Sequence, residues 1–188
     1  LGDCIRDRDS MIRGESWQKA EIPGPIKAFL IDDPKKLAIL VKKAKRPLII
    51  VGYRTARMGG GKLDLVDYIV DLARKIKAHI VVTNTLIREF EARGYAHVYL
   101  MPAMELADRL RDPSWPGFDG GGCYDLAIFI GFPYYFEWLM LNGLKHFAYK
   151  HLRTVSLDPY YQPNATFSPP NMRFDDWVNY LDSLKNNL

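Results

Sequence analysis

The stretch "AKRPLIIVGYRTARMGGGK", residues 44–62, decides the fold class of this chain. It places a four-residue apolar run, residues 48–51, between a proline and a glycine-rich loop that leads toward a helix-like segment. A short apolar run bounded by turn residues is typical of a buried strand, and strand, glycine loop and helix together begin a parallel α/β sheet. Such a loop can bind a phosphate through converging backbone N–H groups, or it can be a simple turn.

Neither common phosphate-binding fingerprint is complete in this loop. A dinucleotide pattern G-x-G-x-x-G that starts at Gly52 would need glycines where Arg54 and Arg57 stand. A Walker pattern built on the later glycine-lysine pair would need a glycine at Ala56 and a hydroxyl at Leu63. The basic residues still give the loop a positive field, so we expect it to contact the pyrophosphate of a dinucleotide. The alternative is a mobile surface loop whose glycines serve flexibility.

The rest of the chain repeats the alternation of helix and strand. Periodic patterns predict helices over residues 34–45, 62–78, 102–112, 134–150 and 174–188, and strands over residues 47–52, 79–85, 124–131 and 152–158. Strands that are apolar on both faces and alternate with helices belong to a parallel sheet covered on each side. We therefore expect a single three-layer α/β domain over residues 34–188, preceded by an arm over residues 1–33.

Ligands of such sheets bind outside the carboxyl ends of the strands, near the point where the strand order reverses. The predicted strands end in polar or glycine-containing clusters, as ordinary strand ends also do. The candidate cofactor-binding residues at these ends are Gly52, Tyr53, Arg54, Thr83, Asn84, Gly131 and Asp158. Asp158 either accepts hydrogen bonds from a ribose or caps the turn before Pro159. Likewise, Thr83 and Asn84 either line the crevice or form a polar turn.

Composition and motifs exclude several classes of function. The chain has 188 residues, 48% hydrophobic and 26% charged, and no apolar run approaches the roughly 20 residues of a membrane-spanning helix. Its net charge of +4 is dispersed, so neither nucleic acid nor a membrane is an expected partner. Cys4 and Cys123 are too few and too distant for a disulfide framework or a metal cluster, so we expect no metal and a cytoplasmic location. No histidine, serine or cysteine pattern predicts a catalytic set.

The predicted helix over residues 134–150 is apolar on nearly all sides, with aromatic residues throughout. A helix that is apolar all round is buried all round, whereas a sheet covers only one side of it. The other side therefore needs a neighbouring helix or a partner protein. Tyrosine, tryptophan, phenylalanine and methionine are enriched in the cores of interfaces, so we expect part of this helix to belong to one.

Three segments resemble a known family when they are taken in order and at their spacing. They are "AKRPLIIVG", "DPSWPGFDGGGCYDLAIFIGF" and "QPNATFS", and they resemble the epsilon subunits of archaeal acetyl-CoA decarbonylase/synthase complexes. The run D-P-x-W-P-G-x-D-G-x-G-x-Y-D is long enough to be specific. The resemblance extends from about Ile22 to the C-terminus.

The resemblance implies a Rossmann-like parallel sheet of about six strands, similar to the DHS-like NAD/FAD-binding fold. It also implies an accessory subunit without chemistry of its own, bound to the carbon monoxide dehydrogenase alpha subunit, in an assembly of two alpha and two epsilon chains. By similarity to flavin-binding domains of thiamine-diphosphate enzymes, it extends a nucleotide role to Gly52 and Asp158, with FAD as the expected cofactor. Two alternatives remain: a free-standing dinucleotide-dependent enzyme, and a regulatory nucleotide-binding protein.

Overall fold

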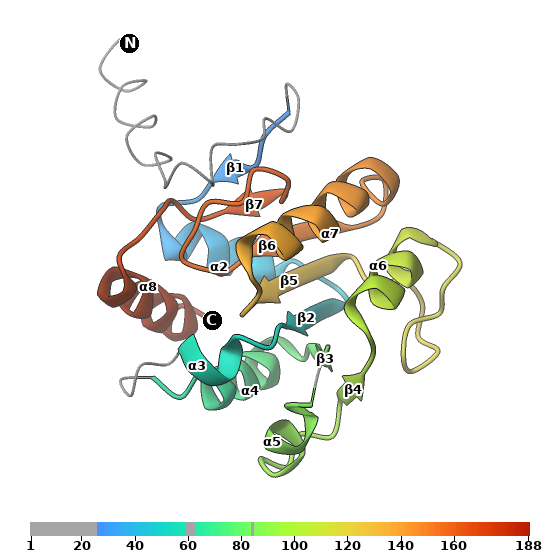
Figure 1. Cartoon of the computed structure of the whole chain (residues 1–188), viewed down its shortest axis with the longest axis horizontal. Helices are drawn as coiled ribbons and strands as arrows, with labels where there is room; N and C mark the ends of the chain where they lie inside the picture. The colour runs from blue at the N-terminus through green and yellow to red at the C-terminus, as the bar shows by residue number, and fades with distance from the viewer. Residues whose placement is uncertain (1–25, 59–62, 84) are drawn as a thin grey trace.

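A computed structural model describes residues 26–58, 63–83 and 85–188 of the chain. Its centre is a seven-stranded sheet in the order β1-β7-β6-β5-β2-β3-β4, in which every pair of neighbours is parallel (Figure 1). The strands are β1 (Phe29–Leu30), β2 (Pro47–Val51), β3 (His79–Val82), β4 (Val98–Leu100), β5 (Leu126–Ile130), β6 (Arg153–Ser156) and β7 (Phe167–Ser168). The predicted parallel α/β class is confirmed, with one strand more than the family resemblance implies.

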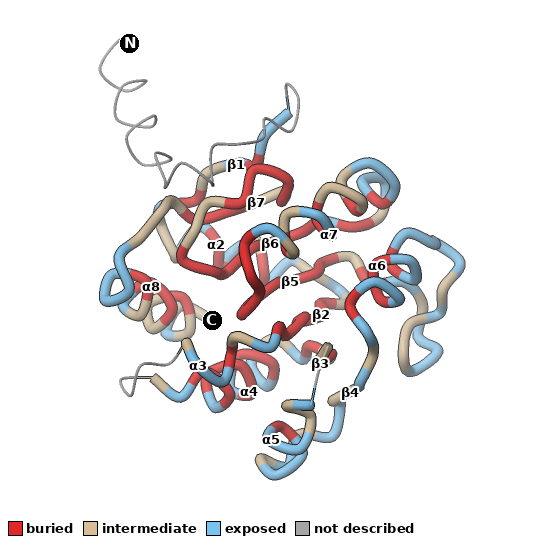
Figure 2. The backbone as a smooth tube through the Cα atoms, in the orientation of Figure 1, coloured by how far each residue is buried: buried red, intermediate tan, exposed pale blue. Residues whose placement is uncertain are grey.

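Helices cover both faces of the sheet and complete the predicted three layers. One face is covered by α2 (Pro34–Lys42), α4 (Leu65–Ile76) and α8 (Phe174–Asn186). The other face is covered by α6 (Ala103–Arg111) and α7 (Tyr134–Phe147). Two short helices, α3 (Thr55–Met58) and α5 (Ile87–Glu91), follow β2 and β3. Alternate residues of β2 enter the two cores, Ile49 and Val51 on the α2 side and Leu48 and Ile50 on the α7 side. The central strands are consequently buried on both faces (Figure 2).

Two aspartates fix where the helices of the α2 side begin. The Asp33 carboxylate accepts the Lys35 N–H at 2.9 Å, and Pro34 takes the first helical position, as predicted. The Asp64 carboxylate accepts the Val66 N–H at 2.9 Å, so α4 begins at Leu65, three residues later than the sequence pattern predicts.

The loop that carries the family-specific run is fastened to the amino end of β2. Asp125 accepts the backbone N–H groups of Lys45 and Arg46 at 2.7 and 2.9 Å, and the Arg46 guanidinium pairs with Asp119 at 2.6 Å. A Cβ at Gly121 would collide with that guanidinium and displace it, so glycine there leaves room for the pair with Asp119. The motif therefore fixes β5 beside β2 at the end of the sheet opposite the predicted ligand site.

The sheet begins earlier in the chain than the helix-strand pattern indicates. Phe29 and Leu30, which the sequence pattern assigns to an arm, pair with Phe167 and Ser168 of β7. Residues 1–25 lie outside the described part of the chain. Among the described helices, none is both long and apolar enough to cross a membrane.

Candidate functional site

The strand order reverses between β2 and β5, and the ends of these two strands meet backbone to backbone. After β2 the chain continues outward to β3 and β4, then returns to place β5 on the other side of β2. The Gly52 N–H donates to the Ile130 carbonyl at 2.9 Å, and the Arg54 N–H donates to the Gly131 carbonyl at 2.9 Å. A Cβ at Gly52 would collide with that Gly131 carbonyl. The approach of β5 therefore requires glycine at position 52, independently of any ligand.

Asp158 holds the turn after β5. Its two carboxylate oxygens accept the N–H groups of Gly131, at 2.7 Å, and Phe132, at 3.0 Å. Gly131 itself has φ +81°, a conformation that favours glycine. The Asp158 side chain is 3% exposed, so it faces the protein interior rather than solvent. It caps the turn after β5, whereas the sequence left open a hydrogen bond to a ribose or a cap for the turn before Pro159.

A second buried carboxyl group, Glu137 of α7, lies beside Asp158. The Gln162 side-chain amide donates to Glu137 Oε2 at 3.1 Å. Burial, and then the charge of Asp158, raise the pKa of Glu137 well above its usual range. Burial also raises the pKa of Asp158 to about 6, although the two backbone N–H groups and the charge on Arg54 each lower it. The two carboxyl groups therefore titrate as a pair, in which burial favours a retained proton on Glu137 and the backbone N–H donors favour the charged form of Asp158.

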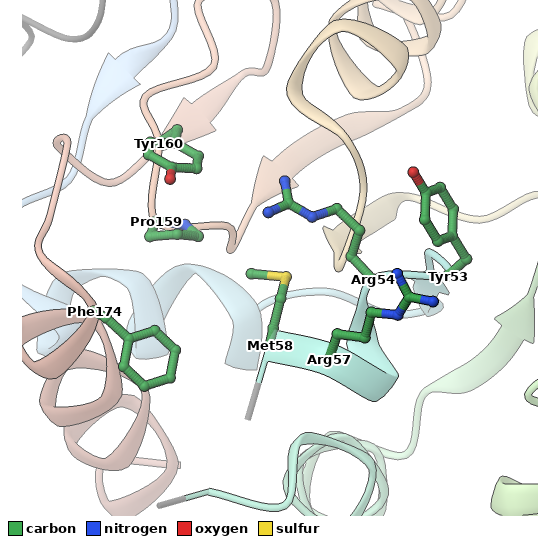
Figure 3. A pocket seen from close by; sticks show the side chains of 7 residues that line it. All are labelled: Tyr53, Arg54, Arg57, Met58, Pro159, Tyr160 and Phe174. Carbon is green, nitrogen blue, oxygen red and sulfur yellow. The ribbon is translucent and has the colours of Figure 1, made fainter. Parts of the chain in front are cut away.

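A cavity of about 550 Å³ opens at this edge of the sheet, beside the β2 turn (Figure 3). Its lining consists of Tyr53, Arg54, Arg57, Met58, Pro159, Tyr160 and Phe174. The first four come from the turn after β2 and from α3, the next two come after β6, and the last begins α8. In the view of Figure 3 the Arg54 guanidinium extends toward Pro159 and Tyr160. The lining contains two arginines and no carboxylate, so it favours an anionic ligand.

The chemistry of the lining suits a ligand with phosphates and a flat ring. Two guanidinium groups can form charge-assisted hydrogen bonds to phosphate oxygens. The aromatic side chains Tyr53, Tyr160 and Phe174 offer surfaces on which a planar ring can stack. The volume lies within the range of about 300–1,000 Å³ that is usual for small-molecule sites. A dinucleotide has both chemical features.

The seven predicted cofactor-binding residues occupy different places around this cavity. Tyr53 and Arg54 line it, and Gly52, Gly131 and Asp158 form the packed turns beside it. The Thr83 hydroxyl donates to the Val51 carbonyl at 2.9 Å and does not belong to the lining. Asn84, together with the glycines and the lysine over residues 59–62, lies outside the described residues.

Sequence reasoning missed part of the lining. Met58 directly follows the basic residues of the loop after β2, and Tyr160 follows the polar residues after β6. Both could have been added to the candidate site because they adjoin predicted site residues in the sequence. Phe174 begins the last helix, and nothing in its local sequence indicates a ligand site. Only the packing of α8 beside α2 brings it to the cavity.

The helix α7 is only partly covered by the rest of the described chain. Its inner residues Met140 and Leu141 are buried in the core between α7 and the sheet. Its outer face, defined here as Tyr135 and Leu139, is exposed, whereas exposed Phe147 in the last turn lies under the Arg111 guanidinium of α6. The predicted helix with apolar residues on two sides is therefore present, and the covering of its outer face by a partner stays a prediction.

Among the described residues, no group of three or more histidine, cysteine, aspartate or glutamate side chains could hold a metal ion. The fold and the cavity define a Rossmann-like α/β protein with a basic and aromatic cavity, a candidate ligand site, at the strand-order reversal.

Comparison with known proteins then gives the family. The chain belongs to the family described as CO dehydrogenase beta subunit/acetyl-CoA synthase epsilon subunit, which matches residues 10–185. It is 35% identical over 170 residues to the acetyl-CoA decarbonylase/synthase complex subunit epsilon of Methanothermobacter thermautotrophicus, covering 89% of this chain and 92% of that one. It is 35% identical over 173 residues to the epsilon subunit of Methanothrix soehngenii, covering 89% and 88%. The resemblance drawn from the sequence motifs is confirmed.

Proposed function

We propose that this chain is a non-catalytic accessory subunit of a cytoplasmic acetyl-CoA decarbonylase/synthase complex and binds its carbon monoxide dehydrogenase alpha subunit. Family membership supports the place in such a complex, because the similar proteins are named as its epsilon subunits. The role without chemistry of its own is what the resemblance to these subunits implies. The assembly contains two alpha and two epsilon chains.

The observation that carries the partner-binding role is the outer face of α7. Tyr135 and Leu139 expose large apolar side chains on one side of the helix, and such patches mark interaction sites. Aromatic residues at such a face supply the central contacts of many interfaces. The alpha subunit covers this face in the complex.

Alanine substitutions on α7 and α2 test this role. Tyr135→Ala and Leu139→Ala are each expected to weaken binding of the alpha subunit about tenfold or more in a surface-immobilised binding assay. The matched control is Ile39→Ala, which removes an exposed aliphatic side chain from α2 on the opposite side of the sheet. Equal binding by all three variants and the unmodified chain would remove the outer face from the interface.

A second role is supported by the basic and aromatic cavity. It binds a dinucleotide, FAD, with the pyrophosphate at Arg54 and Arg57 and a planar ring on the aromatic side chains. In this role FAD accepts electrons from the alpha subunit. When bound, the flavin supplies the redox chemistry, whereas the chain's own residues bind and orient it.

Equilibrium titration with FAD, NAD and ADP tests the cavity. The double variant Arg54→Ala/Arg57→Ala should lose most of the affinity and show a weaker dependence on salt, because it removes both cations of the lining. Arg74→Ala, an exposed arginine of α4 outside this cavity, is the control. If the unmodified chain binds none of the three ligands at about millimolar concentration, the cavity is not a dinucleotide site.

The same titration separates the two alternative functions. Binding of ADP or NAD without FAD would favour a regulatory nucleotide-binding protein. Turnover of CO with a dye acceptor by the isolated chain would favour an enzyme and overturn the accessory role.

A further inference from the structure

A second groove, of about 450 Å³, lies at the amino end of the strands, far from the dinucleotide cavity. It is formed by the segment that enters β1, by the last turn of α7 and the residues just after it, and by the starts of β6 and β7. The edge strand β1 pairs with β7, and no described strand pairs with its other side. The groove is therefore built at one border of the sheet, next to the outer face of α7.

The floor of the groove exposes three large apolar side chains. Ile26 is 71% exposed, Phe29 67% and Tyr149 59%. Scattered exposed apolar residues are ordinary, but these three line one concave site. The Phe29 ring lies 5.9 Å from the ring of Phe167 on the neighbouring strand, which holds it in place at the sheet border. The floor can accept a large apolar side chain from another molecule.

The rim of the groove is positively charged. Lys27, Lys145 and Arg153 contribute to the lining together with His146, and none of the described lining residues is acidic. The Lys145 ammonium donates to the Ile26 carbonyl, which ties α7 to the segment before β1.

This charge distribution selects among the molecules that could fill the groove. A second copy of the chain that met this groove with its own groove would bring the cations of both copies together, and like charges across an interface oppose binding. A basic segment would be repelled for the same reason. An acidic segment with a large apolar side chain matches both the rim and the floor.

We propose that this basic groove binds an acidic segment of a partner protein, with carboxylates against Lys27 and Arg153 and an apolar side chain between Phe29 and Tyr149. The groove adjoins the outer face of α7, because His146 of its lining lies seven residues, about two helical turns, after Leu139 on the same side of the helix. The identity of the partner rests on the proposed function, in which the alpha subunit supplies the segment. The chemistry of recognition does not depend on that identity.

Peptide titration of the isotope-labelled full chain, monitored by nuclear magnetic resonance, tests the groove itself. The probe is a blocked peptide of glutamate, aspartate, leucine and phenylalanine, and its control has lysine in place of every acid. We expect the acidic peptide to shift the amide signals of Phe29, Tyr149 and Ala165, and to bind at least tenfold more weakly at about 500 mM salt than at about 50 mM. No shift in these signals, or equal shifts with the basic peptide, would overturn the proposal.

Charge reversal provides the matched variants. Lys27→Glu/Arg153→Glu should reduce affinity for the acidic peptide at least tenfold, whereas Lys35→Glu/Lys36→Glu on α2 should leave it unchanged. Circular dichroism melting checks that both double variants fold. If the two double variants bind the acidic peptide equally, its binding reflects net charge alone and the groove is not its site.

Assembly with the alpha subunit separates the groove from the proposed function. Suppose that the unmodified chain and the Lys27→Glu/Arg153→Glu variant bind the alpha subunit equally well and that the acidic peptide does not bind. The groove proposal is then wrong, and the proposed function stands. If the chain does not bind the alpha subunit but the acidic peptide binds in the groove, the groove proposal stands and the proposed partner is wrong.

Discussion

At the scale of single residues, Asp158 connects the packing of the sheet with the candidate site. Its carboxylate fixes the turn after β5 through the N–H groups of Gly131 and Phe132, and that turn packs against Gly52. Sequence alone placed Asp158 at the correct edge of the sheet because it comes directly after an apolar run. Sequence could not reveal that both oxygens face inward, since the two N–H donors are separated from Asp158 by 27 and 26 positions along the chain.

Asp158→Asn is expected to lower the free energy of unfolding by about 2–4 kcal/mol. The amide can accept a hydrogen bond through one oxygen only, and its NH2 group would face the other buried N–H donor. Urea denaturation measures the loss. The control is Asp176→Asn, at an exposed position in the first turn of α8, where a change of about 0.5 kcal/mol is expected. Equal losses at the two positions would contradict the turn-holding role of Asp158.

The carboxyl pair predicts a pH dependence of stability with a definite sign. The pKa values of Glu137 and Asp158 are raised in the folded chain, so the folded state keeps a proton that the unfolded state releases near pH 4. The stabilisation from this pair is complete below about pH 4 and is lost as the pH rises through 6. Other carboxyl groups have lowered pKa values, such as Asp64, and act with the opposite sign.

Glu137→Gln isolates this contribution because glutamine imitates the protonated acid and does not titrate. The unmodified chain should lose unfolding free energy relative to the variant between pH 5 and pH 8, by up to about 1.4 kcal/mol per pH unit. Denaturant unfolding of both proteins across this range measures the difference. A difference that is constant with pH would show that Glu137 does not hold a proton in the folded state.

At the scale of elements, the long helices and central strands could be predicted and the short ones could not. The apolar runs of β2 and β5 and the caps Asp33 and Pro34 are local signals, and the structure confirms them. The strands β1 and β7 have two residues each, too few for any periodicity to show. They form because β6 offers a free edge, which is a property of the assembled sheet.

The two sides of α7 should respond differently to truncation. Met140→Ala, in the core, is expected to cost about 2–5 kcal/mol of unfolding free energy, because it leaves a cavity. Leu139 precedes Met140 but lies on the outer face, so Leu139→Ala should lower the unfolding free energy of the isolated chain by about 0.5 kcal/mol or less. Thermal and urea unfolding of the two variants compare them directly. If Leu139→Ala destabilises the chain as much as Met140→Ala, the outer face is part of the core and not a surface for a partner.

At the scale of the whole molecule, the features for binding are distributed over different sides of one sheet. The cavity proposed for a dinucleotide lies at the carboxyl ends of the strands, the basic groove at their amino ends, and the outer face of α7 away from the sheet. The family-specific loop, fastened by Arg46 and Asp119, holds β5 in register with β2 and so keeps these sites in fixed relation. Such an arrangement suits a subunit that contacts a partner and a small molecule at the same time.

The most direct test of the accessory role is sedimentation velocity of the chain mixed with the carbon monoxide dehydrogenase alpha subunit, at about 10 μM each. CO oxidation is assayed in every fraction. We predict that the two proteins move as one boundary with equal numbers of each chain, and that CO oxidation accompanies the alpha subunit and is absent from the isolated chain. Two independent boundaries, or CO oxidation by fractions that contain this chain alone, would contradict the proposed function.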